Sequence, residues 1–592
     1  MNAPDPSRVV DQEKLSGAER KLLAASLQGT LADLRTGRAE ADDPATGANW
    51  RIARRVRAEL LIELLTGQGH PNGRPVRAVK LAGARITGSL DLEAVTLTCS
   101  LLLQDCYIDA PVNFNEATAP AIRMPGCQLP GLTARQLRTT GDVGLAGATF
   151  TTDGEVSLHG AQIGGELDLA MAKLTNPSGT ALDAGSLTVG QGMSCRGCTV
   201  RGEVHLSYAR ISGWLSLDRA TLSNKDGRAL NAAQLTVGQG MYCRDCKAQG
   251  EISLTGAHIA GALTMRRSTL SNQGSRALNA SHLTVEHNMH FVDCTADGVV
   301  DLRSAHIGGV LVISGSTLTN PNGKALAAER MTVGQSLHCR DGFSARGEVC
   351  LLGADIGQRL NLSGASLANP GKRVLDLRAA KAGILFLLPR PPVEGEINLT
   401  GCTVDVLDDN PASWPAAIRL RAFTYNNLAN DRVSVRERLR WLTLQPGGYT
   451  PDIYDQLAAT YRRTGDSGAA SKVAIAKQRR SRHPYSPLSW LWNLTVGYGY
   501  RPWLAGVWLA TFLAVGTWIF GNAHMVATGA NPPAFHPFAY TADVTLPIVD
   551  LGQKTAWEPQ GTALYWSWAL TAAGWVLTTA VVAGLTGILK RD

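Results

Sequence analysis

A three-residue phrase recurs at a nearly constant spacing through the middle of this 592-residue chain. It reads GEV, GEI or GVV, and its copies are 48, 48, 48, 49 and 48 residues apart. The copies begin at Gly154, Gly202, Gly250, Gly298, Gly347 and Gly395. A fixed period of this length is typical of repeat architectures, in which each unit buries its apolar side chains only against its neighbours. We therefore expect one solenoid rather than several globular domains.

Within each unit, small and large apolar residues come in closely spaced pairs. Examples are Ala209 with Ile211, Leu215 with Leu217, and then Ala220 with Leu222. No helix face has this period, whereas alternation over two residues is that of a β-strand. A chain that turns every five or six residues forms four-sided coils of about 22 to 24 residues, so each unit is predicted to contain two coils. About 13 or 14 coils, stacked at about 4.8 Å, would form a rod of roughly 65 Å.

The repeated phrases LAGARITGSLDL from Leu81 and LHGAQIGGELDL from Leu158 resemble the pentapeptide-repeat proteins. This resemblance implies a mainly β fold, a right-handed quadrilateral parallel β-helix. Some members of that family imitate DNA with an acidic face. Here, residues 81–410 carry about 27 basic and about 30 acidic side chains and show no acidic stripe, so we expect no nucleic-acid partner or role in DNA mimicry.

Four regions are expected along the chain. They are a helical N-terminal segment and cap at 1–78, the solenoid at 79–410, a helical cap or hairpin at 411–483, and a membrane module at 484–592. The N-terminal cap is predicted from WRIARR at Trp50, read as an Arg-rich helix, and from AELLIELL at Ala58.

The region after the solenoid has helical spacing. VRERLRWL ends before Pro446, and two helices are predicted at 452–463 and 467–478. This hairpin is similar to a single tetratricopeptide-type repeat. It either closes the open edge of the solenoid or offers a docking surface, with Tyr461 and Arg462, to a cytoplasmic protein partner.

Two apolar segments, 503–523 and 564–589, are predicted to cross the lipid bilayer as transmembrane helices. Basic residues precede the first segment, including Arg479 and Arg480, and Lys590 follows the second. Because positive charge favours the cytoplasmic side, we expect a multi-pass protein of the inner (plasma) membrane with both termini and the solenoid in the cytoplasm.

The link between the two segments has the layout of a two-span ion channel. Residues 535–553 are predicted to form a short re-entrant helix followed by an extended pore loop, in which Thr545, Asp550 and Gly552 line the path. Such a loop needs neighbouring subunits to satisfy its backbone, so this interpretation requires a homo-oligomer. Pro547 removes a backbone donor that a potassium filter would use. The alternative is an oligomeric anchor with a non-conducting outer plug.

The pairs Cys195 with Cys198 and Cys243 with Cys246 have the spacing of redox or zinc sites. The aligned position of the next repeat holds Phe291, so these sites behave as inward packing positions. Successive pairs lie two coils apart, about 10 Å, which is too far to share one zinc ion. A thiol relay is the alternative. The sequence predicts no metal site, no cofactor and no catalytic residue.

The order of all these segments resembles a group of actinobacterial membrane proteins often labelled "membrane-associated oxidoreductase". Besides the cap and the array, the resemblance rests on YDQLAATYRRTG from Tyr454, VGYGYRPW from Val496, LPIVDLGQ from Leu546 and GWVLTTAVVAGLTG from Gly574. The sequence is therefore compatible with three functions. They are a membrane-anchored cytoplasmic scaffold or sensor without a catalytic site, an ion-channel-like oligomer, and the oxidoreductase that the resemblance implies.

Overall fold

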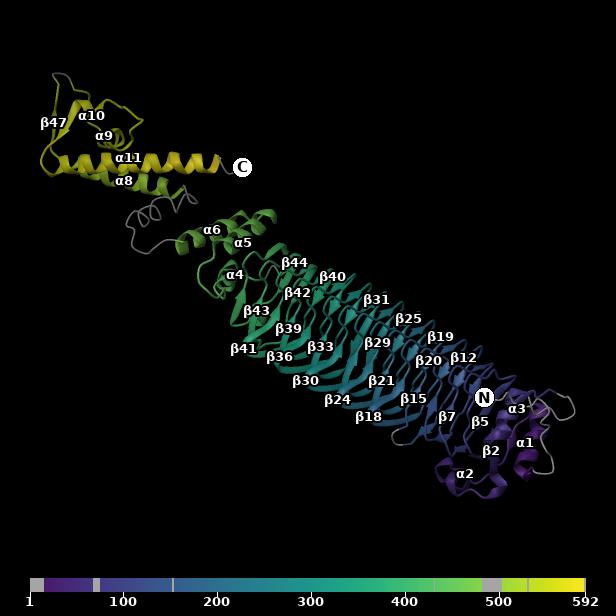
Figure 1. The fold of residues 1–592 in the computed structure, drawn as a ribbon. Coiled ribbons are helices and arrows are strands. Elements are labelled where there is room, and N and C mark those ends of the chain that lie inside the picture. The colour runs from purple at the N-terminus through teal and green to yellow at the C-terminus, as the bar shows by residue number, and fades with distance from the viewer. Residues whose placement is uncertain are drawn as a thin grey trace. The chain divides into compact units, whose positions relative to one another are not determined.

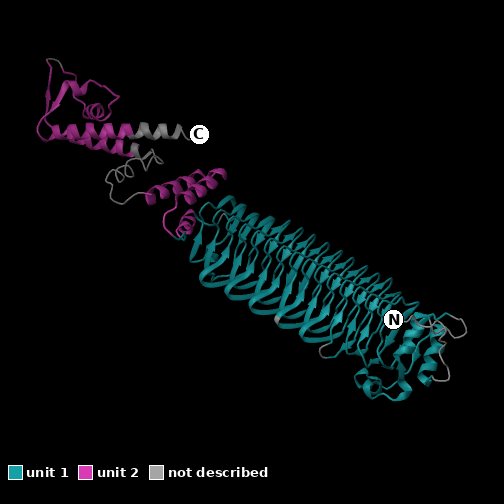
Figure 2. Ribbon diagram, viewed as in Figure 1, with its two compact units in different colours: residues 1–434, 444–446 teal, residues 435–443, 447–592 magenta. Residues whose placement is uncertain are grey.

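The structure is a computed structural model that describes residues 15–67, 75–151, 154–430, 432–481, 503–529 and 532–589. Side chains at 226, 503–505 and 580–589 are outside this description. The chain divides into two compact units (Figure 2). The first comprises Met1–Ser434 with Leu444–Pro446, and the second comprises Val435–Thr443 with Gly447–Asp592.

A parallel β-solenoid of about 15 turns makes up most of the first unit (Figure 1), which confirms the predicted repeat fold. Its strands form two large sheets of 27 and 19 strands. The prediction of 13 or 14 turns was too low, because the solenoid has strands before residue 79 and after residue 410. β1 (Ala32–Asp33) and β2 (Arg55–Arg57) precede them, and β45 (Ala417–Arg419) and β46 (Thr424–Leu428) follow.

Each turn contains four short extended sides. In one turn these are β19 (Thr188–Val189), β20 (Met193–Ser194) and the two arms of β21 (Thr199–His205). They pair in register with the next turn, whose strands are β22 (Arg210–Ile211), β23 (Leu215–Ser216) and β24 (Thr221–Asn231). The two-residue alternation that the sequence shows therefore places one residue of each pair in the interior.

Turns of two lengths alternate, and together they produce the 48-residue period. Thr199 pairs with Thr221, 22 positions later, and Thr221 pairs with Lys247, 26 positions later. The longer turns carry the extra residues in 11-residue strands. These strands are β18 (Lys173–Asp183), β24, β30 (Thr269–Asn279), β36 (Thr317–Ala327) and β41 (Ser366–Asp376). Uniform coils of 22 to 24 residues were therefore wrong in detail, because the inserts loop out of the wall and leave the stacking unchanged.

The recurring glycine of the GEV phrase lets a short turn pass beneath such a loop. In the loop at 224–227, Asn224 Nδ2 donates to the carbonyl oxygen of Arg228 at 2.9 Å. One turn later, Gly250 has φ +111°, and a Cβ there would collide with the carbonyl oxygen of Asn224. Gly347 has the same relation to Asn320. Only glycine accepts both the backbone angle and the close approach.

The interior is a stack of aliphatic side chains in register. One row alternates leucine from the long turns with valine or isoleucine from the short ones, and all of its members are buried. The row runs through Leu182, Val204, Leu230, Ile252, Leu278, Val300, Leu326, Val349, Leu375 and Ile397. Burial of each such side chain contributes about 1.5–3 kcal/mol, and no turn achieves it alone.

A polar row runs directly beside this aliphatic row, at a corner of the coil. It includes Asp183, Asn279, Asp301, Asp376 and Asn398, each one residue after an aliphatic member. Their side-chain oxygens accept the backbone N–H two residues later, as in Asp301 with Arg303 at 3.1 Å. These turns satisfy backbone donors at the corner, which explains why Asn279, Asp301, Asp376 and Asn398 are buried there.

The N-terminal segment covers the first turn of the solenoid. β1 pairs with β3 (Ala78–Ala82), and β2 pairs with β4 (Arg85–Thr87). The phrase WRIARR was predicted to be helical, and this was wrong. Its residues form a 3₁₀ turn, Ile52–Arg54, and the start of β2, because pairing with the exposed sheet edge competes with helix formation. AELLIELL forms the predicted helix, α3 (Ala58–Thr66).

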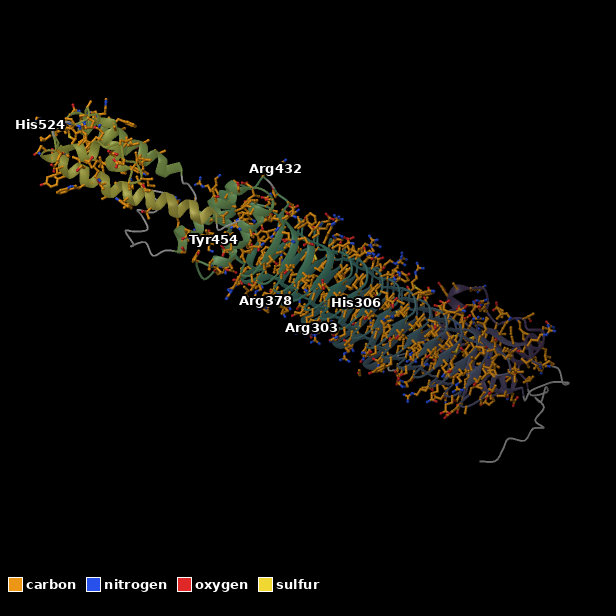
Figure 3. The ribbon with its side chains drawn as sticks, turned by 90° about the horizontal axis from the view of Figure 1, so that it is seen from above. Arg303, His306, Arg378, Arg432, Tyr454 and His524 are labelled. Atoms are coloured by element: carbon orange, nitrogen blue, oxygen red, sulfur yellow. The ribbon has the colours of Figure 1, made fainter. Side chains whose placement is uncertain are left out.

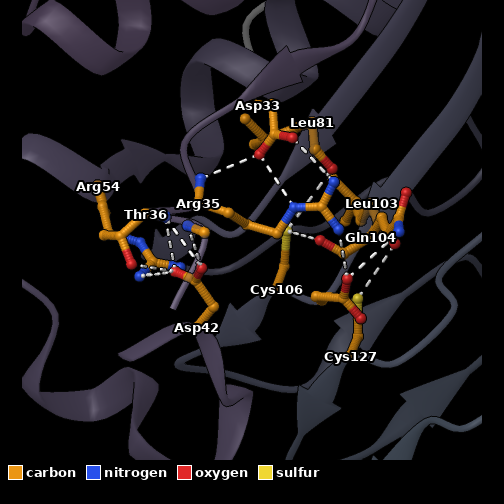
Figure 4. Close-up of polar contacts among 12 residues, drawn as sticks. Asp33, Arg35, Thr36, Asp42, Arg54, Leu81, Leu103, Gln104, Cys106 and Cys127 are labelled. Atoms are coloured by element: carbon orange, nitrogen blue, oxygen red, sulfur yellow. Dashed lines mark hydrogen bonds and ion pairs between the residues drawn. The ribbon is translucent and has the colours of Figure 1, made fainter. Parts of the chain in front are cut away.

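Two arginines fasten this cap to the solenoid (Figure 4). The guanidinium group of Arg35 bridges Asp33 at 2.8 Å and Asp105 at 2.9 Å. Arg54 donates from Nε to the carbonyl oxygen of Gly83 at 2.6 Å and stacks on the ring of Trp50 at 3.5 Å. The segment therefore satisfies the backbone edge that the first turn would otherwise expose.

The second unit is mainly helical. Three predicted helices are confirmed as α4 (Val435–Leu442), α5 (Pro451–Arg463) and α6 (Ser467–Ser481). The predicted spans at 503–523 and 564–589 correspond to α8 (Trp503–Gly521) and α11 (Thr562–Leu589). Across the described residues, none of the helices combines the length and the apolar character needed to cross a bilayer.

Candidate functional site

A short helix of the link packs against both long helices of the C-terminal part. This helix, α9 (Pro537–Thr545), lies in the position where the sequence predicted a short helix between two long ones. Its Tyr540 and Val544 share a buried cluster with Phe520 of α8 and Leu570 of α11. The rings of Phe520 and Tyr540 meet edge to face, with centroids 4.8 Å apart.

Two glycines make room for α9. A Cβ at Gly516 of α8 would collide with the side chain of Thr541. A Cβ at Gly574 of α11 would collide with the backbone carbonyl oxygen of Thr545. The absence of a side chain at Gly574 therefore lets α11 approach the backbone of α9 directly.

Asp543 organises the segment that follows α9, a role that the sequence analysis missed. Its carboxylate is buried and accepts backbone N–H groups from Gln553 at 2.8 Å, from Lys554 at 3.1 Å and from Leu551. Three backbone donors therefore satisfy the hydrogen-bonding capacity of this buried carboxylate. The only available signal was a second acidic residue, besides Asp550, in an otherwise mostly apolar stretch.

Gln553 ties the two ends of the link segment together. It opens α10 (Gln553–Ala556) and is buried. Its Oε1 accepts the backbone N–H of His536 at 3.2 Å, and its Nε2 donates to the carbonyl oxygen of Ala534 at 3.1 Å. The indole N–H of Trp557 donates to the carbonyl oxygen of Pro533 at 3.0 Å. Residues 546–552 are thus held at both ends and return along α9.

The three predicted pore-loop residues differ in their surroundings. Thr545 is completely buried, and its hydroxyl has no hydrogen-bond partner among the described residues. Asp550 and Gly552 are exposed, and the Asp550 carboxylate accepts the backbone N–H of Gly552 at 3.0 Å. Gly552 has φ +72°, which favours glycine at this turn. Of the three predicted pore-loop residues, Asp550 and Gly552 are therefore the two that a single chain exposes.

All eleven cysteines are buried, and none forms a disulfide. Cys195 and Cys198 lie on one corner, where the backbone N–H of Cys198 donates to the carbonyl oxygen of Cys195 at 3.2 Å. Burial raises the pKa of Cys246 to about 12 and also raises that of Cys243. The neighbouring Cys195 thiol and burial raise the pKa of Cys198. Such thiols remain protonated at neutral pH, which favours a packing role.

One group of side chains in the described part of the chain has the spacing of metal ligands. Ligand atoms of Glu348, Cys350 and Asp376 lie within 4.8 Å of one another. However, Asp376 already pairs with Arg378 at 2.7 Å and Arg373 at 2.9 Å, and burial raises the pKa of the Cys350 thiol to about 11. A cation would have to displace two guanidinium groups and ionise the thiol. The residues therefore do not fit a metal ion.

The predicted docking residues lie on α5. Arg462 is exposed, whereas Tyr461 is half-buried. Burial raises the pKa of Tyr461, and the nearby charge of Arg438 opposes this. The two helices of the hairpin are also joined by an ion pair of 2.6 Å between Lys477 and Asp455. Of the two predicted docking residues, Arg462 is therefore the more exposed.

Comparison with known proteins identifies no relative. No family model, no curated protein and no solved structure matches this chain. The oxidoreductase activity implied by the sequence resemblance stays a prediction.

Proposed function

We propose that this chain is a membrane-anchored scaffold or sensor. Its C-terminal helices would lie in the lipid bilayer as a homo-oligomer and hold the solenoid in the cytoplasm. One observation carries the proposal. Among the eighteen exposed large hydrophobic side chains of the described residues, thirteen belong to residues 507–576. A concentration of apolar surface of this kind marks a membrane or protein interface.

These side chains come from both long helices and from the link between them. The aromatic residues among them, such as Trp518, Trp566 and Trp568, are of the type that gathers at membrane interfaces. Along the solenoid walls the exposed large hydrophobics are isolated, for instance Met171 and Tyr208. Isolated exposed apolar residues are normal on a protein surface, so the contrast favours a lipid-facing C-terminal region.

Flotation with lipid vesicles tests the anchor. We expect the full-length protein to float with vesicles, and the double variant Trp568→Arg and Trp575→Arg to lose most of this binding, because each side chain is 60% exposed and a charge there opposes burial in lipid. The matched control places the same charges on the solenoid, in Met171→Arg and Tyr208→Arg, and should float like the wild type. A wild-type protein that stays with the soluble fraction would overturn the proposal.

A conducting pore is the second candidate, favoured by the arrangement around α9. The helix packs against α8 and α11, and Asp543 anchors the following segment so that Asp550 is exposed. In an oligomer, Asp550 residues from several chains would form a ring of negative charge, which selects cations. We expect currents from the full-length protein in planar bilayers and a loss of cation preference in Asp550→Asn. Bilayers without any current would exclude this candidate.

The oxidoreductase prediction has a separate test. An absorbance spectrum of the purified protein with flavin, haem or iron-sulfur bands would support it, whereas their absence would count against it.

A further inference from the structure

A groove lies between two successive loops on one edge of the solenoid. Its walls are the loops at 272–275 in β30 and 320–323 in β36, and β33 (Thr295–Asp301) contributes to its floor. The volume is about 710 Å³. A groove of this volume has the size of a small-molecule site.

The groove forms where the repeat departs from its own pattern. In three other copies, the glutamate of the GEV or GEI phrase lies opposite the basic residue that ends the preceding loop. The pairs are Arg228 with Glu251, Lys324 with Glu348 and Arg373 with Glu396. In the GVV copy, Val299 lies opposite Arg276. The shorter, uncharged side chain leaves space and removes the carboxylate that would face the loop cation.

A second departure from the repeat pattern, at Ala327, also lines this groove. The polar row beside the aliphatic core continues from Asn279 to Asp301 and then reaches Ala327. Alanine replaces the asparagine or aspartate found at the equivalent position of the other long turns, Asp183, Asn231, Asn279 and Asp376. Both Val299 and Ala327 line the groove.

Two of the three acidic groups of the groove, Asp301 and Glu329, are less exposed than the basic groups with which they pair. The side chain of Asp301 is 2% exposed, whereas those of Arg276 and Arg303 are 46% and 45% exposed. Asp301 accepts from Nε of Arg303 at 2.9 Å and from Nη2 at 2.6 Å, and Nε of Arg276 lies 3.4 Å from it. Because a guanidinium group has five N–H donors, both arginines have donors to offer a ligand. Arg303 is labelled on the solenoid in Figure 3.

Lys324, the third cation of the groove, also pairs with a carboxylate that is less exposed than itself. Lys324 pairs with Glu329, whose side chain is 15% exposed while that of Lys324 is 40% exposed. Asp297, at the floor, accepts a hydrogen bond from Nε2 of Gln273 at 2.7 Å. The accessible charged groups of the groove are therefore three partly exposed cations, Arg276, Arg303 and Lys324, and one half-buried carboxylate, Asp297.

The remaining lining residues are suited to hydroxyl groups. Gln273, Thr319, Asn320 and Asn322 supply amides and a hydroxyl, and the residues that line the groove include no aromatic ring. A nucleobase usually stacks on aromatic side chains, so this lining does not favour a nucleotide.

We propose that this groove binds a sugar that carries one anionic group, a phosphate or a carboxylate. Arg276 and Arg303 pair with the anion through paired N–H donors, and Lys324 adds its charge. The amide side chains and the loop backbone bind the hydroxyl groups. This assignment is independent of the membrane proposal.

Calorimetric titration of the full-length protein in detergent tests the ligand class. Glucose 6-phosphate and glucuronate are the two probes, and glucose and inorganic phosphate are the controls. We expect at least one charged sugar to bind at least tenfold more tightly than both controls, and the tighter of the two shows whether phosphate or carboxylate is preferred. Glucose binding as tightly as the charged sugars, phosphate alone binding as tightly, or no binding at millimolar concentration would overturn the proposal.

Variants place the binding in the groove. Val299→Glu restores the carboxylate that other repeats have, so we expect an intact fold and an affinity reduced at least tenfold. Arg303→Gln should reduce it similarly and serves as a second variant if the first does not fold. The control Arg228→Gln removes the equivalent loop cation one repeat earlier and should leave the affinity unchanged. Affinity that survives both groove variants, or that falls equally in the control, would contradict the site.

Discussion

At the scale of single residues, the solenoid depends on backbone angles that most side chains avoid. Eighteen described residues other than glycine have positive φ, all of them between Ala94 and Ala422. Many occupy corners, such as Arg219, where the N–H of Ala220 donates to the carbonyl oxygen of Leu217 at 3.1 Å. Each costs about 1–2 kcal/mol, which the stacked turns have to offset. Glycine is required only where a neighbouring backbone is also close.

Two glycine substitutions separate the cost of a positive φ from the cost of a close neighbouring backbone. Gly347 has φ +125° and would place a Cβ against the carbonyl oxygen of Asn320, whereas Gly364 has φ +71° and open space around it. We expect Gly347→Ala to lower the free energy of unfolding by about 3 kcal/mol, and Gly364→Ala by about 1 kcal/mol. Thermal unfolding followed by circular dichroism measures both. Equal losses would show that the loop does not restrict the turn below it.

Buried thiols predict how stability changes at alkaline pH. Burial raises the pKa of Cys339 to about 12, whereas the pKa of a cysteine in an unfolded chain is about 8.5. Above that pH the unfolded chain releases the proton first, so the stabilisation is complete below about pH 8.5 and is lost as the pH rises toward 12. The unfolding free energy of the wild type should therefore fall more steeply over this range than that of Cys339→Ala. Parallel curves for the two proteins would contradict the assignment.

At the scale of elements, the repeat made the stacked strands predictable, whereas local departures from the repeat were not predicted. The spacing of Ala209, Ile211 and Leu215 predicted stacked short strands, because a period of two has one structural solution. The helices at 452–463 and 467–478 followed from their own apolar spacing. The alternation of long and short turns was missed, because a loop that leaves the wall does not change the apolar pattern around it.

Other misses arose where contacts distant in sequence decide the structure. The residues after Trp50 have a helical composition, yet Arg55–Arg57 pairs with β4, so an available sheet edge outweighed local preference. Asp543 was not selected as functional, because its three backbone donors lie eight to eleven residues later in the chain. That Thr545 lines a path in an oligomer stays a prediction. In the single chain it is buried, and its carbonyl oxygen lies beside Gly574 of α11.

The packing of α9 against α11 gives a prediction for two helical glycines. We expect Gly574→Ala to displace α11 from the carbonyl of Thr545 and to lower the unfolding temperature of the C-terminal part by several degrees. Gly506→Ala, in α8, has open space and should be neutral or slightly stabilising, because alanine favours helix more than glycine does. Differential scanning calorimetry of the full-length protein compares them. A stable Gly574→Ala variant would show that the close contact is not required.

At the scale of the whole molecule, the two units suggest different tasks. The solenoid presents a long, polar wall on which one repeat, with Val299 and Ala327, has diverged to form a groove. The C-terminal part concentrates exposed apolar side chains that a single chain in water leaves uncovered. Lipid and further copies of the chain together would cover them, which is why the account combines an anchor with an oligomer.

Electron micrographs of the full-length protein extracted from membranes test this account most directly. We predict that extraction requires detergent and that each particle carries several solenoids attached to one detergent-covered centre with rotational symmetry. Protein recovered without detergent, or particles with one solenoid each, would contradict it.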